Sequence, residues 1–268
     1  MTTSVNTLTT AYDPPATTSP SERLARGGGW WTLLLSLLML VAVTESLNAA
    51  ASSEGLEIVR LAVLGGALLS FMLSLTRWDG AFPVMYSILA SFVWIATLFT
   101  QLMFDGMGLR EGALELFQRN INWIRALLEG TSGADNLIFV TQLSILGWWI
   151  GFLAIWSLFR HQRLLSAVIP GGVALLVNAY YSTESMTGYL VLYAAAVLLL
   201  AIRVELARNE ARWQVTRVRY APDITLDFLK AGLGFTALVI VLAWAMPDVA
   251  QNLTVERMLR PFEGPWQK

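Results

Sequence analysis

The sequence predicts an all-α, polytopic membrane protein with about seven transmembrane helices plus one outer amphipathic helix. Of its 268 residues, 56% are hydrophobic and only 14% are charged, whereas soluble domains carry about 25% charged residues. The apolar residues also come in long continuous runs rather than in helical stripes. Because a bilayer is crossed by about 20 apolar residues in a helix, these runs are expected to be membrane spans.

The chain divides into three predicted parts. Residues 1–29 are rich in Thr, Ser and Pro at their start and are expected to form a disordered cytoplasmic tail. Residues 30–246 form the helical membrane bundle. Residues 247–268 are polar, contain several prolines, and are expected to be an extracytoplasmic tail or linker. The predicted spans are 30–44, 58–76, 82–104, 137–159, 164–181, 186–202 and 228–246.

Local features support the ends of several spans. The first run begins at Trp30 after a glycine-rich hinge and ends at the acidic segment TESLNAAASSEGLE. The runs 164–181 and 186–202 are joined by only STES, which predicts a tight helical hairpin. Before the last run, Asp223 follows Pro222, where its carboxylate can cap the first turn.

Lys and Arg set the predicted orientation, because these residues accumulate on the cytoplasmic side. With the amino terminus inside, the inner segments hold eleven of them and the outer segments hold six, with Arg60 left within a span. The chain is therefore predicted to be integral to the cytoplasmic (plasma) membrane, with its amino terminus inside and its carboxyl terminus outside.

Two stretches outside the spans have their own pattern. Segment 203–227 is predicted to continue the sixth helix into the cytoplasm and then turn. Segment 109–130 separates apolar from charged residues, which predicts an amphipathic helix lying on the outer surface or packed over the mouth of the bundle. Its predicted apolar face consists of Leu109, Ala113, Leu116, Phe117, Ile121, Ile124 and Leu128.

The composition excludes several kinds of chemistry within this chain. It has no Cys and a single His, His161, so it lacks thiol nucleophiles, thiolate metal sites and paired imidazole ligands. Ionisable groups mark transport sites when they lie deep in a membrane. Here Glu45, Asp105 and Lys230 lie at the ends of runs, and Arg60 is expected to snorkel to water. We expect no enzyme activity, no catalytic residue, no cofactor and no metal site.

Two sets of residues are candidates for contacts with partners. Gly147 and Gly151 form the GxxxG pattern GWWIG, which allows close helix packing inside the chain or between subunits, although 20 glycines make a chance match easy. The cytoplasmic segment is either an ordinary positive-inside anchor at anionic headgroups or a docking surface for a cytoplasmic partner. The residues of that surface are Trp213, Arg217, Arg219, Tyr220 and Asp223.

The end of the chain resembles the membrane half of transglutaminase-like proteins of the TgpA type. The resemblance lies in the order of four segments, which are ARWQVTRVRYAPDITLDFLK, an apolar span, MPD and LRPFEGPWQ. The upstream GWWIGFLAIWSLFRHQRLLSAVIPGGVALLVNAYY is similar too, so the resemblance runs from about Leu137 to Lys268. It implies a bundle that leads into an extracytoplasmic transglutaminase-like domain with Cys-His-Asp chemistry. Because this chain has no Cys, no catalytic residue carries over, and the resemblance implies an anchor without its enzyme.

The predicted function is a non-catalytic membrane anchor and scaffold of a transglutaminase-like protein, with regulation of an extracytoplasmic module as an added role. The polar end of the chain is then expected to lead toward a domain that this chain lacks, unless the chain is a paralogue that works without the enzyme. The expected partners are the lipid bilayer and either that outer domain or other membrane subunits, with no nucleic acid. Oligomerisation stays open.

Two alternative functions also stay open. One is an accessory transmembrane subunit of a larger membrane complex, which an exposed groove of small residues around Gly147 and Gly151 would favour. The other is a small-solute transporter or flippase, which polar residues converging around Arg60, Gln142 or Asn178 would favour.

Overall fold

In the computed structural model every regular element of the described residues is an α-helix, which confirms the predicted fold class. The described residues are 29–50, 55–78, 80–104, 106–130, 135–182, 185–216, 230–238 and 241. The helices are α2 (Gly29–Ala50), α3 (Leu56–Ser74), α4 (Phe82–Leu102), α5 (Leu109–Leu128), α6 (Asn136–His161), α7 (Leu164–Tyr181) and α8 (Thr187–Thr216).

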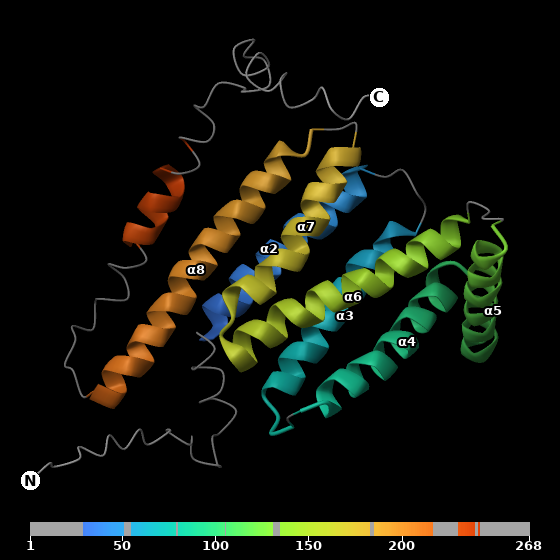
Figure 1. The fold of residues 1–268 in the computed structure, drawn as a ribbon, viewed down its shortest axis with the longest axis horizontal. Helices are drawn as coiled ribbons and strands as arrows, with labels where there is room; N and C mark the ends of the chain where they lie inside the picture. Colours follow the sequence, from blue (N-terminus) through green and yellow to red (C-terminus); the bar gives the residue numbers. More distant parts are fainter. Residues whose placement is uncertain are drawn as a thin grey trace, which may run out of the picture.

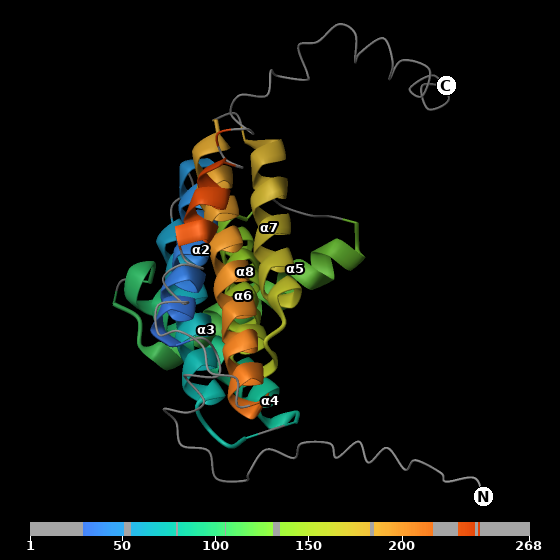
Figure 2. The same ribbon diagram turned by 90° about the vertical axis from the view of Figure 1, so that its left-hand side faces the viewer.

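Six of these helices, all except α5, are long and apolar enough to cross a membrane. They form a bundle in which successive spans run in opposite directions, and α5 lies across one end of it (Figures 1 and 2). Six predicted spans therefore have a counterpart among the described helices. The seventh, 228–246, lies largely outside the described residues, but its part 230–238 is helical. A Cβ on Gly232 would lie 2.6 Å from Ile202 Cδ1, so this part packs against α8.

The first helix is longer than the apolar run that predicted it. We expected a span that ends at residue 44 and an acidic loop after it, but α2 continues to Ala50. The additional turns contain Glu45, whose carboxylate lies 3.2 Å from Arg60 Nη1 on α3. Both side chains are partly exposed, 55% for Arg60 and 37% for Glu45, which agrees with the expectation that they reach water, and the structure adds that the two charges form an ion pair.

The last described span also exceeds its predicted length. The apolar run ends at residue 202, whereas α8 continues without a break to Thr216 and contains 30 residues. A helix of that length extends about 45 Å at 1.5 Å per residue, which exceeds the bilayer hydrocarbon thickness of about 30 Å. The polar end of α8 therefore reaches beyond the hydrocarbon layer, in agreement with the predicted continuation of the sixth helix.

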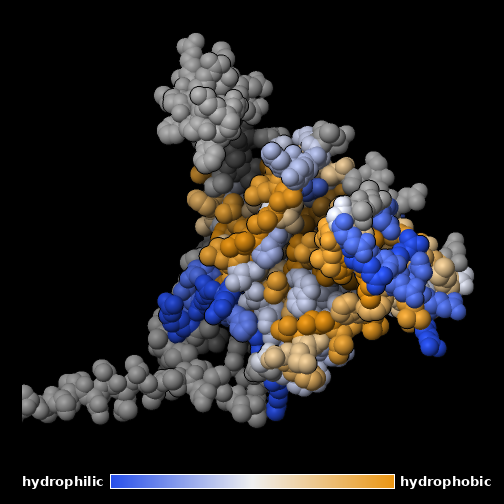
Figure 3. All heavy atoms as spheres, turned by 45° about the vertical axis from the view of Figure 1, so that its right-hand side comes forward, coloured by the Kyte–Doolittle hydropathy of each residue, from blue (hydrophilic) through white to orange (hydrophobic). Residues whose placement is uncertain are grey.

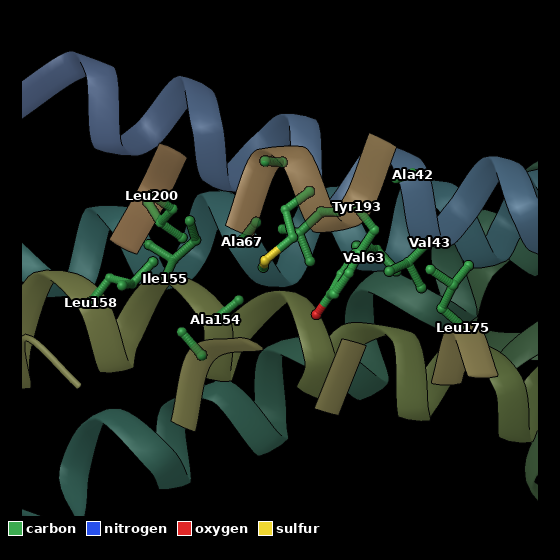
Figure 4. Close-up of a cluster of buried hydrophobic side chains, with 14 of the residues drawn as sticks. Ala42, Val43, Val63, Ala67, Ala154, Ile155, Leu158, Leu175, Tyr193 and Leu200 are labelled. Carbon is green, nitrogen blue, oxygen red and sulfur yellow. The ribbon is translucent and has the colours of Figure 1, made fainter. Parts of the chain in front are cut away.

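The two largest hydrophobic clusters of the described residues hold the bundle together. The larger one joins α2, α3, α6, α7 and α8 (Figure 4). The smaller one joins α3, α4, α5 and α6 around Phe99, which is completely buried. Because α3 and α6 contribute to both clusters and share the most extensive helix–helix interface, this pair forms the centre of the fold. The labelled side chains of the larger cluster are Ala42, Val43, Val63, Ala67, Ala154, Ile155, Leu158, Leu175, Tyr193 and Leu200.

Candidate functional site

The structure describes little of the predicted cytoplasmic docking surface. Trp213 lies on the last turns of α8, whose backbone alone is described there. The other four residues, Arg217, Arg219, Tyr220 and Asp223, lie outside the described residues. The docking surface therefore stays a prediction.

Gly147 and Gly151 lie in the interface between α6 and α3. A Cβ on Gly151 would lie 2.1 Å from the carbonyl oxygen of Val63, and one on Gly147 would lie 2.9 Å from Val63 Cγ2. Such short distances mean that only glycine allows the two backbones to approach so closely. The pattern therefore packs inside the chain in this structure and does not line an exposed groove.

The opposite helix makes a matching close approach that the sequence reasoning missed. A Cβ on Gly66 of α3 would lie 2.2 Å from the carbonyl oxygen of Trp148 on α6. The signal was present as LGGALLS in the second span, because adjacent small residues in a transmembrane helix allow close packing. The α3–α6 contact is thus reciprocal, with a glycine of each helix placed against the backbone of the other.

Polar side chains within the spans are engaged in separate contacts. Arg60 pairs with Glu45 of α2, as described above. Asn178 Nδ2 of α7 donates to the Ser46 carbonyl oxygen at 2.8 Å. Gln142 Nε2 of α6 donates to Oδ1 of an asparagine on α5 at 3.0 Å. Each of the three therefore joins a different pair of helices.

Helix α5 is fixed to the start of α6 by polar contacts. Arg119 lies 2.6 Å from Glu115 on its own helix and 3.7 Å from Asp135. Asp135 also caps α6, since its Oδ1 accepts from the Leu137 N–H at 2.9 Å. The next residue of α5, Asn120, accepts from the Gln142 amide of α6 at 3.0 Å. These contacts hold α5 across the end of the bundle.

The apolar side of α5 is used only in part. Leu116 is buried against α4 and α6, and Gly112 packs against Thr100 of α4. The sequence left open whether this helix lies on the outer surface or packs over the bundle mouth; in the structure its apolar side contacts the bundle through these two residues, and most of its predicted apolar face is exposed. In Figure 3, hydrophilic side chains gather at the α5 end, while apolar side chains cover the flanks. The exposed apolar residues of α5 include Leu109, Phe117, Ile121, Ile124 and Leu128.

Arginines hold the loops at the opposite end of the bundle. Arg160, at the end of α6, donates to the carbonyl oxygens of Thr76 at 3.3 Å and Trp78 at 3.4 Å. Arg208 of α8 donates to the carbonyl oxygen of Gln162 in the α6–α7 turn. At least two of the arginines that predicted a cytoplasmic side therefore also tie loops to helices.

A lateral groove lies between α3 and α4, in the halves of these helices next to their connecting loop. Its volume is about 490 Å³, and its lining side chains are almost entirely apolar. The indole N–H groups at its walls are already bonded, Trp94 to the Leu61 carbonyl oxygen at 3.1 Å and Trp148 to Ser87 Oγ at 3.0 Å. We call this feature the α3–α4 groove; it is lined by Gly65, Leu68, Leu69, Met72, Tyr86, Leu89, Ala90, Val93, Trp94 and Trp148.

Within the described ranges, no three side chains of His, Asp or Glu gather closely enough to bind a metal ion. The chain matches no protein-family model, and neither a curated protein nor a solved structure is significantly similar to it.

Proposed function

We propose that this chain is a non-catalytic membrane anchor and scaffold whose α5 end supports an extracytoplasmic module. The observation that carries the proposal is the attachment of α5. Arg119 and Asn120 connect it to Asp135 and Gln142 in the first turns of α6, and Leu116 and Gly112 pack it against α4, so α5 forms a fixed platform at the ends of α4 and α6. The predicted orientation puts this end outside the membrane, where the resemblance to TgpA-type proteins implies a transglutaminase-like domain.

The polar contacts within the spans support a scaffold role more than a transport role. A substrate path requires polar groups that converge on a shared space in the membrane. Here the side chains of Arg60, Gln142 and Asn178 do not share a space; each makes a contact that joins a different pair of helices. Such contacts stabilise helix association, as interhelical hydrogen bonds do in membrane proteins. Regulation of the outer module would act through the same platform.

An accessory subunit of a larger membrane complex is the second candidate. Helix α7 favours it, because only Ala167, Gly171 and Leu175 of its 18 residues are buried within the chain. Large apolar side chains of α7 are exposed and available to lipid or to the helices of another subunit, among them Leu165, Ile169, Val173, Leu176 and Val177. In that role the chain would contribute packing surfaces rather than a platform.

The test is the mass of the native protein in membranes of the source cells. An antibody against residues 109–130 would detect it after separation under denaturing conditions, and mass spectrometry of the band would identify its peptides. A species much heavier than 29.6 kDa that also contains transglutaminase-like peptides supports the anchor. A species at 29.6 kDa that comigrates with other subunits under native conditions supports the accessory subunit and contradicts the anchor.

A flux measurement tests the transport alternative independently. The purified chain would be placed in liposomes loaded with a fluorescent solute mixture and a labelled phospholipid. Solute release or lipid flipping above that of protein-free liposomes, abolished by Arg60→Gln, would contradict the scaffold proposal. The scaffold proposal expects the rate of protein-free liposomes.

A further inference from the structure

The α3–α4 groove runs from the middle of two spans toward one membrane boundary. Its walls come from the carboxyl-terminal half of α3, from Gly65 to Met72, and from the amino-terminal half of α4, from Tyr86 to Trp94. The loop that joins the two helices follows Ser74, at the end of the groove next to Met72 and Tyr86. The groove therefore has one end in the hydrocarbon layer and the other at the level of the headgroups.

The occupant of the groove has to be apolar along most of its length. The lining is formed by aliphatic and aromatic carbon, and the N–H groups of Trp94 and Trp148 already donate to acceptors within the chain. A polar ligand would lose its hydrogen bonds with water and gain none from these walls. Within a membrane, a hydrocarbon chain meets this requirement.

The shape of the rim favours a thin hydrocarbon chain over a second helix. Close helix association in membranes depends on small residues, as the α3–α6 interface shows with Gly66 and Gly151. Large side chains on the groove rim would hold a helix backbone away from the floor, whereas a flexible acyl chain can lie between them. These rim residues are Leu68, Met72, Leu89 and Val93, with exposed fractions of 57%, 57%, 67% and 64%.

The boundary end of the groove carries groups suited to a phospholipid headgroup. The ring centroids of Trp78 and Tyr86 lie 6.3 Å apart, and Trp and Tyr are enriched at the headgroup level. Within the described part of the chain, the Tyr86 hydroxyl has no hydrogen-bond partner and Arg77 forms no ion pair. Arg77 is exposed beside Trp78. Basic residues at the cytoplasmic ends of spans attract anionic headgroups.

We propose that the α3–α4 groove binds one acyl chain of an anionic glycerophospholipid, whose phosphate lies at the membrane boundary near Arg77 and the Tyr86 hydroxyl. The apolar lining of the groove accounts for the binding of an acyl chain, and Arg77 accounts for the preference for a negatively charged headgroup. This site is separate from the α5 platform, so it does not depend on the proposed scaffold function.

The test is lipid binding by the purified full chain, followed by native mass spectrometry. The chain in detergent would be titrated with phosphatidylglycerol and, separately, with phosphatidylcholine. Ala90→Phe fills the groove, while Ala194→Phe makes the same change at an exposed position of α8. We expect one tightly held phosphatidylglycerol per chain, a loss of at least tenfold in affinity for Ala90→Phe, and no change for Ala194→Phe.

A second pair of variants tests the headgroup contact. Arg77→Gln is expected to reduce the preference for phosphatidylglycerol over phosphatidylcholine several-fold. Arg110 is an exposed arginine at the opposite end of the bundle, and Arg110→Gln is expected to leave this preference unchanged. Equal binding of both lipids by the unaltered chain would overturn the headgroup assignment. Equal affinities of the two Phe variants would overturn the groove assignment.

A measurement on the unaltered chain covers the case in which Ala90→Phe does not fold. Phosphatidylglycerol with a photoreactive acyl chain would be crosslinked and the labelled peptides identified. Labelling concentrated on peptides from α3 and α4 supports the proposal, and uniform labelling of all spans contradicts it. A dimer that becomes monomeric on Ala90→Phe would show that a second copy, and not a lipid, occupies the groove.

Discussion

Replacing Gly151 with alanine tests whether the α3–α6 contact holds the bundle together. The new Cβ would lie 2.1 Å from the Val63 carbonyl oxygen, 3.0 Å from Val63 C and 3.1 Å from Ala67 N, whereas ordinary contact begins at 3.4 Å. The shortfall at the oxygen is 1.3 Å (3.4 minus 2.1). All three atoms belong to the backbone, so no side-chain rotation can relieve the overlap.

The helices must therefore move apart, which loosens the largest interface of the fold. Overpacking of a core costs typically about 1–3 kcal/mol, and a clash with backbone belongs at the upper end. We expect Gly151→Ala to lower the free energy of unfolding by about 3 kcal/mol. Gly147→Ala should cost about 1 kcal/mol, because its nearest atom is a Val63 methyl at 2.9 Å that can yield.

The assay is unfolding in mixed micelles with increasing dodecyl sulfate, followed by circular dichroism. Gly188→Ala is the matched control, because no atom lies within 4 Å of the position of its Cβ; a change within about 0.5 kcal/mol is expected there. Gly66→Ala should resemble Gly151→Ala, since its Cβ would lie 2.2 Å from a backbone oxygen. If Gly151→Ala costs no more than Gly188→Ala, the close approach of α3 and α6 is refuted.

Three further substitutions test individual polar contacts. Tyr193→Phe removes a hydroxyl that donates to a carbonyl oxygen of α7, and we expect a loss of about 1 kcal/mol in the free energy of unfolding. Gln142→Ala and Asn120→Ala, alone and together, should show a coupling of about 0.6 kcal/mol in a double-mutant cycle, the average for hydrogen bonds within membrane proteins. Arg119→Gln should raise amide hydrogen exchange across α5 several-fold, while changing the free energy of unfolding by less than about 1 kcal/mol, because its ion pairs are partly exposed.

Each of these tests has a control and an opposing result. Tyr180→Phe changes an 82% exposed tyrosine and should leave stability unchanged; a loss equal to that of Tyr193→Phe would argue against the buried hydrogen bond. Additive effects of the two amide substitutions would show that the side chains do not interact. Arg110→Gln is the control for Arg119→Gln and should not alter amide hydrogen exchange in α5. If the amides of α5 stay protected from exchange after Arg119→Gln, apolar packing alone holds the helix in place.

Local sequence patterns predicted the helices well. The bounds of α7 agree with the predicted run 164–181, and α4 and α6 differ from theirs by two residues or fewer at each end. The amphipathic helix was expected at 109–130 and is found at Leu109–Leu128. These elements depend on residues close together in the chain, so apolar runs and helical periodicity were sufficient to find them.

The structure differs from the sequence-based prediction where helices contact one another. The acidic segment that begins at Glu45 predicted the end of the first span, but α2 continues to Ala50 and Glu45 pairs with Arg60 of α3. The apolar stripe of α5 left two placements open, on the outer surface or packed over the bundle mouth; in the structure Leu116 and Gly112 make the contact with the bundle and most of the stripe is exposed. In both cases the structure depends on which other helix lies nearby, and the residue pattern of a single helix does not show which helix that is.

The sequence by itself determined that this is a helical membrane protein, where most of its spans begin and end, and that its ionisable groups lie near span ends. These properties follow from the length and polarity of each run against the thickness of a bilayer. Only the tertiary structure decided that Gly66 and Gly151 meet opposite backbones, that Arg119 ties α5 to α6, and that α3 and α4 leave a groove between them. Lipid favours every apolar helix equally, so the choice of neighbours depends on shape and on a few polar partners that become visible only when the helices are packed together.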